Sequence, residues 1–310
     1  MTGGPLGERG FIEALRALAH DPAARRLTDD AAVLPMPIAE SLVLTHDMLV
    51  EGVHFLPTDP PGDVAWKLLA VNLSDLAAKG ARPVGVLMGY GLTGDAAWDS
   101  AFVAGLGETL AAFGVPLLGG DTVAQPLGDS RVLGLTALGA SGVAVPSRSG
   151  ARAGDSLYVT GTIGDAGAGL AIARGEHGAA DLLAAYRRPQ PRLAEGRALA
   201  PLVHAMMDVS DGLLIDAERM AAASGLAVEI NLATVPLSDA LRARGDDRTA
   251  RLAATTAGDD YELLFALPPH TPPPVAATRV GRFATGTGLT LVDSDVRVPL
   301  PSRLGYLHAQ

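Results

Sequence analysis

The sequence has 310 residues, a formal net charge of −10 and no cysteine. The length favours two domains, and the acidic charge argues against a general nucleic-acid-binding protein, which would be basic. Without cysteine, disulfides, zinc–thiolate sites, iron–sulfur clusters and thiol catalysis are excluded. No apolar run reaches the roughly 18 residues of a membrane span, and the N-terminus lacks the pattern of a signal peptide. We therefore expect a cytoplasmic protein with no membrane partner.

The N-terminal half predicts strands and helices in alternation. The expected helices cover residues 8–19, 63–79 and 95–113. The expected strands cover residues 41–46, 84–92, 115–120 and 132–140. Asp63 is a candidate cap for the second helix, and Gly80 and Gly114 are placed to end the second and third helices.

Turn-forming and charged residues at 146–155, PSRSGARAGD, mark a domain boundary, and we place the two domains at 1–147 and 148–310. Beyond the boundary, the glycine-rich turn GTIGDAGAG leads into a helix, and a capped helix is expected over 210–225. The expected strands cover residues 156–161, 204–209, 226–232 and 261–267. Since strands and helices alternate in both halves, the predicted fold class is α/β.

Aspartates recur where apolar strands meet turns or helix starts, which is where open α/β sheets place ligand sites. They are Asp29, Asp30, Asp47, Asp75, Asp121, Asp208, Asp211, Asp259 and Asp260. Several hard oxygen ligands without cysteine suit Mg²⁺ or Ca²⁺. Because Mg²⁺ is usually held by a few carboxylates together with substrate phosphates, the pattern predicts a phosphorylated substrate. The alternative is that each Asp only caps a helix or forms a turn.

Two of these positions allow further interpretation. Asp75 is predicted to lie inside a helix, either paired with Lys79 on a solvated face or presented as a metal ligand. In DVSDG (208–212) a strand ends and a helix begins, so free backbone N–H groups there attract anions. Two acids at the same point would repel a phosphate unless a metal intervenes, although Ser210 or Asp211 can also serve as a simple N-cap. The chain has no Walker A motif and no GxSxG elbow.

These motifs together resemble the thiamine-monophosphate kinase family, which belongs to the ATP-binding superfamily of aminoimidazole ribonucleotide synthetase. The resemblance runs in order through TDDAAVL, THDMLVEGVHF, WKLLAVNLSDLAAKGARPVG, GGDT, SRSGARAGDSLYVTGTIGDAGAGL, MDVSDGLLIDAERMA, AGDDYELLF and a C-terminal GYLH. It implies transfer of the γ-phosphoryl of ATP to thiamine monophosphate. It also implies an N-terminal α/β domain whose sheet pairs with a second subunit in a homodimer, and a C-terminal α/β domain that closes the cleft, with mixed sheets.

The resemblance also implies roles for single residues. Asp47 and Asp211 would be catalytic, and Gly120, Asp121, Arg148 and Ser210 would contact ATP. His54, Asp259 and Tyr306 would contact thiamine monophosphate. The ligands of several Mg²⁺ ions would be Asp30, Thr45, His46, Asp47, Asp75, Asp121, Asp208 and Asp211.

The chain departs from the family pattern at two points. His46 stands where the family usually has a second Thr or Ser, so a metal contact there would involve its side chain or a backbone carbonyl. The tail ends on Tyr306, Leu307 and His308 without the usual final Phe, which leaves Tyr306 as the aromatic candidate to stack on the thiamine ring. Glu51 has no role that the residues or the resemblance assign.

Other functions remain open at this point. Another activity of the superfamily is one, although selenophosphate synthetase normally needs a reactive Cys or selenocysteine, and this chain has no cysteine. A Mg²⁺-dependent phosphohydrolase is a second, and a non-enzymatic nucleotide-binding protein is a third. The phosphotransferase fits the physics best, because phosphoryl transfer depends mostly on positioning and charge neutralisation.

Overall fold

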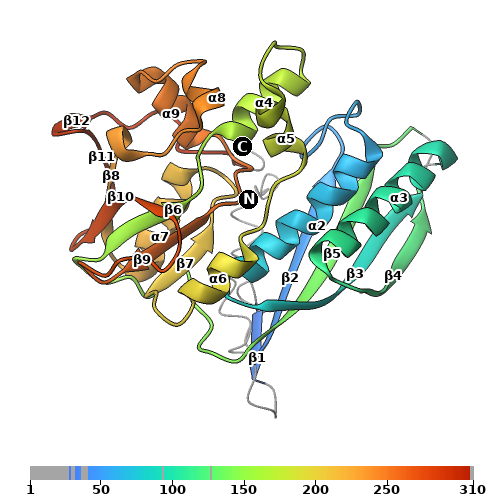
Figure 1. Cartoon of the computed structure of the whole chain (residues 1–310), viewed down its shortest axis with the longest axis horizontal. Helices are drawn as coiled ribbons and strands as arrows, with labels where there is room; N and C mark the ends of the chain where they lie inside the picture. Colours follow the sequence, from blue (N-terminus) through green and yellow to red (C-terminus); the bar gives the residue numbers. More distant parts are fainter. Residues whose placement is uncertain (1–27, 29–31, 36–40, 93, 126–127, 308–310) are drawn as a thin grey trace, which may run out of the picture.

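Two mixed sheets lie side by side, each with helices packed against it (Figure 1). The computed structural model describes residues 28, 32–35, 41–92, 94–125 and 128–307. The helix expected at 8–19 lies outside this part of the chain. The predicted α/β class with two mixed sheets is confirmed. The boundary at 147–148 stays a prediction, and it falls between the last strand of the first sheet and the first strand of the second.

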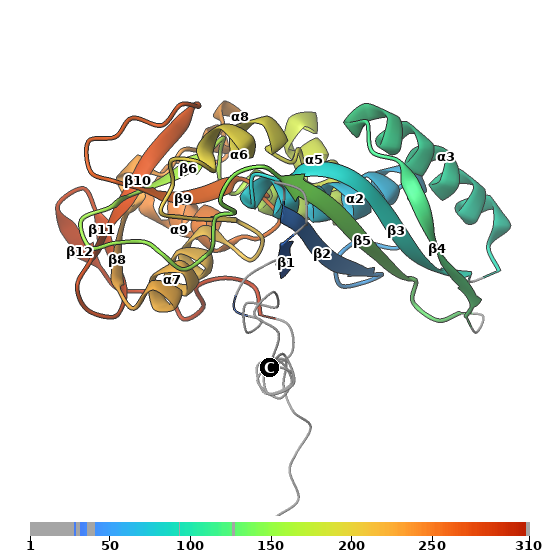
Figure 2. The same cartoon turned by 90° about the horizontal axis from the view of Figure 1, so that it is seen from below.

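The N-terminal sheet has the order β1-β2-β5-β3-β4, and among its described strands only the pair β3–β4 is parallel. Its strands are β1 (Ala32–Pro35), β2 (Ser41–Val50), β3 (Arg82–Leu92), β4 (Leu117–Ala124) and β5 (Val132–Ser141). Two helices, α2 (Pro61–Ala78) and α3 (Ala96–Phe113), cover one face, and the view in Figure 2 looks toward the opposite face. An apolar core fills the space between the sheet and these helices.

The C-terminal sheet has the order β12-β11-β8-β10-β6-β9-β7, with β8–β11 as its parallel pair. Its strands are β6 (Ser156–Thr160), β7 (Ala205–Asp208), β8 (Ala227–Asn231), β9 (Leu263–Leu267), β10 (Ala277–Ala284), β11 (Gly288–Asp293) and β12 (Val296–Val298). Its helices are α4 (Asp165–Ala173), α5 (Ala180–Arg187), α6 (Leu193–Leu199), α7 (Leu213–Ser224), α8 (Asp239–Arg242) and α9 (Arg248–Thr256), with a 3-10 turn η2 (Leu232–Thr234). The main core of this half lies between the sheet and α7.

Helix α2 joins the two halves. Its leucines pack against the N-terminal sheet, while Ala77 and Ala78 share a third apolar cluster with residues of α6, β7 and β9. Almost the whole helix after its first turn is buried. A polar side chain on α2 must therefore pair within the protein, because burying an unpaired polar group is costly. This requirement shapes the site.

The helix boundaries differ from the predictions in ways that have local causes. Helix α2 starts at Pro61 with Pro60 as its N-cap residue, so Asp63 lies in the first turn and is not the cap. Helix α3 matches its prediction, with Asp95 accepting from the backbone N–H of Trp98 and Gly114 ending the helix in the left-handed conformation. No helix in the described ranges is long and apolar enough to cross a membrane.

Candidate active site

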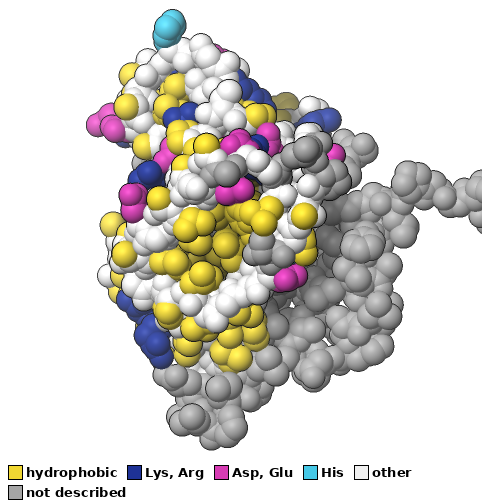
Figure 3. Space-filling model, turned by 90° about the vertical axis from the view of Figure 1, so that its right-hand side faces the viewer, with side chains coloured by type: hydrophobic (Ala, Val, Ile, Leu, Met, Phe, Trp, Pro, Cys, Tyr) yellow, Lys and Arg dark blue, Asp and Glu magenta, His cyan; other side chains and the backbone are white. Residues whose placement is uncertain are grey.

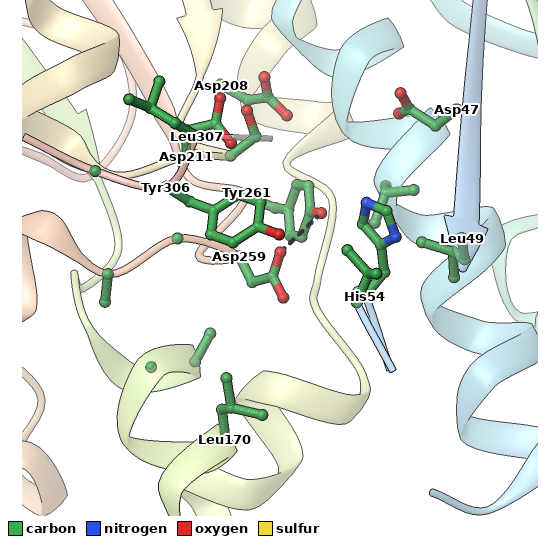
Figure 4. A pocket seen from close by; sticks show the side chains of 18 of the residues that line it. Asp47, Leu49, His54, Leu170, Asp208, Asp211, Asp259, Tyr261, Tyr306 and Leu307 are labelled. Carbon is green, nitrogen blue, oxygen red and sulfur yellow. Dashed lines mark hydrogen bonds between the residues drawn. The ribbon is translucent and has the colours of Figure 1, made fainter. Parts of the chain in front are cut away.

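A cavity of about 740 Å³ lies between the two halves, and both contribute its walls. It brings together eight of the residues predicted from the sequence. These are Asp47, His54, Asp75, Asp208, Ser210, Asp211, Asp259 and Tyr306. Figure 4 shows His54 and Asp47 facing Tyr261, Tyr306 and Asp208 across the cavity. Residues more than 200 positions apart therefore share one acidic cleft.

The wall from the N-terminal half is formed by β2 and α2. Asp47 lies within β2, three residues before the strand ends, and its backbone N–H donates to Asn72 Oδ1 at 3.0 Å. Asp75 lies three residues further along α2 and accepts a hydrogen bond from the buried hydroxyl of Thr45. Asn72 and Thr45 thus fix strand and helix in register, which places both carboxylates at the cavity.

The interpretation of Asp75 and Lys79 as a pair on a solvated face is wrong. Lys79 is fully buried and its ammonium lies 3.5 Å from the backbone oxygen of Met206 on β7. Asp75 is 9% exposed and borders the cavity. This position agrees with the second interpretation, in which the rigid helix presents Asp75 as a ligand of a metal ion.

The wall from the C-terminal half starts at the end of β7. Asp208 is the last residue of this strand, and its carboxylate accepts from the hydroxyl of Ser74 on α2 at 2.5 Å. The bond crosses from one half of the molecule to the other. Because Ser74 is the neighbour of Asp75 on α2, this hydrogen bond fixes the position of Asp208 relative to Asp75.

The DVSDG segment is organised by a residue that the sequence did not single out. Neither Ser210 nor Asp211 caps α7, contrary to the prediction, because the helix begins only at Leu213. Instead Asp216 Oδ2 accepts from the backbone N–H groups of Ser210, Asp211 and Gly212, at 3.1, 3.0 and 3.2 Å. Because Asp216 is the fourth residue of α7, its carboxylate can reach back to these N–H groups, as capping carboxylates do at helix starts.

Charge around this segment is balanced by arginines. Arg219 on α7 forms ion pairs with both Asp211 and Asp216. The pKa of Asp216 is raised to about 6, because burial and the Asp211 carboxylate raise it more than the positive charges of Arg219 and Arg148 lower it. The effect of Arg148 shows that this predicted ATP contact lies close enough to act on the DVSDG segment, although it does not border the cavity.

His54 and Asp259 face the cavity from opposite halves. His54 Nδ1 accepts from the backbone N–H of Val50 at 3.0 Å, which fixes the orientation of the ring. Asp259 Oδ1 accepts from the Tyr261 hydroxyl at 3.2 Å. The pKa of Tyr261 is well above its usual value, first because of burial and then because of the charges of Asp259, Asp47 and Asp208. The three carboxylates therefore lie close enough to Tyr261 to raise its pKa.

The C-terminal segment reaches the cleft by packing on the DVSDG loop. The backbone N–H of Tyr306 donates to the backbone oxygen of Asp211 at 2.9 Å, and the Tyr306 ring is 46% exposed at the cavity. A Cβ on Gly305 would lie 2.4 Å from Ile215 Cγ2 and 2.5 Å from the Asp211 oxygen. Glycine at 305 therefore allows the segment to approach closely enough to present Tyr306.

Gly120 and Asp121 are not brought to this cavity. Asp121 pairs in register with Gly89, which pairs with Gly134, which pairs with Met48. Asp121 therefore lies on the same sheet face as Met48, and Asp47, the neighbour of Met48 along β2, points to the other face. Within one copy of the chain, Asp47 and Asp121 cannot contact the same metal ion.

Two other predicted metal positions, Thr45 and His46, lie outside the cavity lining. Thr45 is one residue back from the cavity, behind Asp75. His46 lies on the open face of the sheet, with Nδ1 2.9 Å from the Thr136 hydroxyl. Asp30 lies outside the described residues. A role of His46 through its backbone carbonyl is compatible with this placement, whereas its ring points away from the cleft.

Glu51 now has a structural explanation. Its carboxylate accepts from Arg131 Nη1 at 2.9 Å, and Arg131 also pairs with Asp95 and lies over the Trp98 ring. These contacts tie the end of β2 to the start of β5 and to the first turn of α3. Glu51 does not border the cavity.

The donor set of the cleft fits magnesium brought by a phosphorylated substrate. The cavity carboxylates are oxygen ligands, which suit a hard cation. Within the described residues, no three carboxylate or imidazole side chains converge closely enough to form a metal site by themselves. Mg²⁺ commonly takes one or two carboxylates and completes its coordination with phosphate oxygens and water. The observed spread of aspartates matches that kind of site and not a closed structural one.

The two-layer halves and the acidic cleft between them define a protein of the AIR synthase related class. The models for the N-terminal and C-terminal domains of AIR synthase related proteins match residues 28–141 and 152–297. The curated thiamine-monophosphate kinase of Caulobacter vibrioides is 41% identical over 315 residues, covering 95% of this chain and 88% of that protein. The one from Escherichia coli K12 is 42% identical over 247 residues, covering 77% and 75%.

Solved structures give the same result. AaThiL complexed with AMPPCP and TMP superposes with a TM-score of 0.86 at 29% identity, covering 99% of both chains. The thiamine-monophosphate kinase of Stenotrophomonas maltophilia K279a superposes with a TM-score of 0.75 at 35% identity, covering 91% of this chain and 94% of that one. The chain belongs to the thiamine-monophosphate kinase family.

The residues that support the site were mostly missed from the sequence. They are Lys67, Asn72, Ser74, Asp216, Arg219 and Tyr261. A usable signal existed for some of them. Asn72 and Ser74 are polar residues in an otherwise apolar helix, and such residues need partners when the helix is buried. Nothing local indicates that Lys67 pairs with a residue 192 positions away.

Proposed function

We propose that the cleft between the two halves transfers the γ-phosphoryl of ATP to thiamine monophosphate, giving thiamine diphosphate and ADP. The observation that carries this proposal is the meeting of Asp47, Asp75, Asp208 and Asp211 in one cavity, in a chain whose curated relatives are thiamine-monophosphate kinases. The related AaThiL was solved with both AMPPCP and TMP. A cytoplasmic location, where ATP is abundant, belongs to the same proposal.

Of the five aspartates that line the cavity, Asp47, Asp75, Asp208 and Asp211 would hold Mg²⁺, and Asp47 and Asp211 are the proposed catalytic pair. When bound, Mg²⁺ supplies positive charge that neutralises the phosphates of both substrates. Asp216 and Arg219 keep the DVSDG segment in one conformation, so Asp208 and Asp211 are positioned before substrate arrives. This preorganisation matters because phosphoryl transfer depends mostly on positioning.

The remaining predicted residues divide between the two substrates. Ser210 and Arg148 lie at or near the DVSDG segment and are proposed to contact ATP. His54, Asp259 and Tyr306 line the cavity and are proposed to contact thiamine monophosphate, with the Tyr306 ring stacking on the thiamine. An acceptor phosphate oxygen is already anionic, so no strong general base is needed. It attacks the γ-phosphorus directly, and the bond to the ADP oxygen breaks without a phosphoenzyme.

We also propose that the active unit is a homodimer that forms through the open face of the N-terminal sheet. Exposed apolar side chains gather on this sheet, including Met48, Leu87, Leu118 and Val123. Figure 3 looks at the side of the molecule that carries β4 and α3, and a broad hydrophobic patch is visible there. Asp121 lies on the open face, so a second copy offers a way for Gly120 and Asp121 to reach a cleft.

The activity is tested by incubating the protein with ATP, Mg²⁺ and thiamine monophosphate and measuring the product masses. Thiamine diphosphate and ADP in equal amounts support the proposal. Free phosphate with no thiamine diphosphate would identify a hydrolase and overturn it. Adding EDTA should abolish product formation, because the carboxylate-lined cleft needs the cation to accept two polyanions.

The shared site is tested by mixing subunits. Asp47→Asn and Asp121→Asn each inactivate their own homodimer if Asp121 serves the partner's cleft. After the two proteins are mixed and reassorted, half of the dimers carry one intact cleft, so roughly a quarter of the wild-type activity should return. No recovery, in dimers shown by mass spectrometry to be mixed, would contradict a site shared between subunits.

A further inference from the structure

Lys67 is a buried cation that the proposed mechanism does not use. It lies on α2 with only 3% of its side chain exposed. The ammonium group of Lys67 has two oxygen acceptors and one aromatic ring around it. It donates to Asp259 Oδ2 at 2.6 Å and to the backbone oxygen of His54 at 3.0 Å, and it lies 4.3 Å from the centroid of the Tyr186 ring.

Both oxygen acceptors come from residues that line the cavity. His54 comes from the turn after β2, and Asp259 comes from the loop before β9, and both border the cavity. Lys67 does not border it. The ammonium therefore lies behind the cavity and connects the two walls that face the proposed acceptor. A change in its charge or length would alter the distance between them.

The Asp259 loop needs such a support. Asp259 and Tyr261 have φ angles of 70° and 51°, in the left-handed region that residues other than glycine rarely adopt. The backbone N–H of Asp259 donates to the Ser210 oxygen at 2.8 Å, which fixes one side of the loop. The Lys67 ion pair fixes the side chain. Without it, the Asp259 carboxylate, which lines the same cavity as Asp47 and Asp208, would lack its compensating cation.

We propose that Lys67 is a positioning residue that sets the spacing of His54 and Asp259 and thereby the affinity for the phosphorylated acceptor. The inference rests on the proposed assignment of these two residues to the acceptor. It predicts a selective effect. The KM for thiamine monophosphate depends on Lys67, while the KM for ATP does not, because the proposed ATP contacts lie at the DVSDG segment.

The test compares Lys67→Met, which keeps the chain length and removes the charge, with Lys67→Arg, which keeps the charge. Arg187→Met is the matched control. Arg187 also pairs with a buried carboxylate across the two halves, Asp59, which is 3% exposed, and neither partner borders the cavity. Steady-state KM for each substrate, kcat and the thermal melting temperature are measured for every variant.

Lys67→Met should raise the KM for thiamine monophosphate about tenfold or more and change the KM for ATP less than about twofold. Lys67→Arg should recover part of the loss. Arg187→Met should lower the melting temperature and leave both KM values unchanged. If Lys67→Met lowers only the melting temperature, or raises both KM values equally, the positioning role is wrong.

A double variant tests whether Lys67 acts through Asp259, and it also avoids misfolding caused by a buried unpaired charge. Lys67→Met with Asp259→Asn removes both charges, so no carboxylate is left buried beside an absent cation. If Lys67 acts through Asp259, the double variant should have an acceptor KM within about twofold of Asp259→Asn alone. If the effects of the two substitutions on the acceptor KM are additive, Lys67 does not act through Asp259. If Asp259→Asn leaves the acceptor KM unchanged, the inference fails with the assignment of Asp259, whereas product formation by the wild type tests the activity independently.

Discussion

Asp47 and Asp211 lie on opposite walls of the cleft, one on β2 and the other just after β7. Each is held by neighbours that leave its carboxylate at the cavity. Asn72 fixes the Asp47 backbone, while Asp216 and Arg219 fix Asp211. Replacing either carboxylate by an amide preserves shape and removes one negative charge. A loss of activity in such a variant therefore reports the missing charge and not a change in packing.

Asp47→Asn and Asp211→Asn should each lower kcat by about 10²-fold or more, the scale seen when one electrostatic contact to a transition state is lost. Circular dichroism should show an unchanged fold. Glu51→Gln is the control, because Glu51 is an acid just past the end of β2 that pairs with Arg131 away from the cavity. Near-normal kcat in both aspartate variants would contradict the metal-cleft model.

Tyr306 gives a second prediction for a single residue. If its ring stacks on the thiamine, Tyr306→Ala should raise the KM for thiamine monophosphate about fivefold, in line with an aromatic contact of about 1 kcal/mol. Tyr306→Phe keeps the ring and should change this KM little. Equal effects of the two substitutions would show that the hydroxyl matters and the ring does not.

At the scale of elements, α2 links the site to both cores. It carries Lys67, Asn72, Ser74 and Asp75, and it packs on both sheets. The sequence predicted the helix and its apolar side correctly, because leucines recur at helical spacing. It could not show that the opposite side is buried as well, since a second packing partner leaves no periodic signal in the helix itself.

Tertiary contacts that leave no local signal in the sequence also explain the strands and the helix boundary that were not predicted correctly. The strands β10, β11 and β12 follow the segment PPHTPPP (268–274), and only a minority of their residues are buried, without strict alternation. The start of α7 was placed too early because Ser210 and Asp211 are favourable caps, whereas the carboxylate that accepts from their N–H groups comes from Asp216, inside the helix. Tertiary structure overrides local preference in both cases.

Helix α6 is anchored by an ion pair whose loss should be costly. Arg192 donates to Glu262 through two nitrogens, with Nε–Oε2 at 2.7 Å, and the Glu262 side chain is 7% exposed. Arg192→Met leaves this carboxylate buried without its cation and should lower the free energy of unfolding by about 3–5 kcal/mol. Chemical denaturation measures the change.

Arg282→Met is the comparison for that experiment. Arg282 pairs with Glu229 at 2.9 Å, but the two side chains are 60% and 34% exposed. Exposed pairs typically contribute about 0–1 kcal/mol, since water screens them. Equal losses in the two variants would mean that burial of Glu262 does not determine the energy of its pair.

For the whole molecule, the sequence correctly indicated two α/β halves with mixed sheets, and eight of the predicted site residues line the cavity between them. The agreement has a physical basis, because motifs that surround a common ligand are concentrated at strand ends and helix starts. What the single chain cannot show is how Asp121 takes part. It lies on the face of the sheet opposite Asp47, and the proposed dimer supplies the explanation.

Leu87→Asp tests the dimer at this scale. Leu87 is 42% exposed on the open face of the sheet, so a charge there should oppose burial against a second copy. Light scattering coupled to size exclusion should show half the wild-type mass, with activity lost. Val296→Asp, on an exposed β12 residue in the other half, should leave mass and activity unchanged. A wild-type mass for Leu87→Asp would argue against this interface.

The most direct test of the central claim is a crystal structure of the protein with Mn²⁺ in place of Mg²⁺, a non-hydrolysable ATP analogue and thiamine monophosphate, with anomalous differences measured at the manganese edge. We predict anomalous peaks in the cavity beside Asp47, Asp75, Asp208 and Asp211, each bridged to phosphate oxygens. Both substrates bound in the cavity with no peak beside any of the four aspartates would contradict the account.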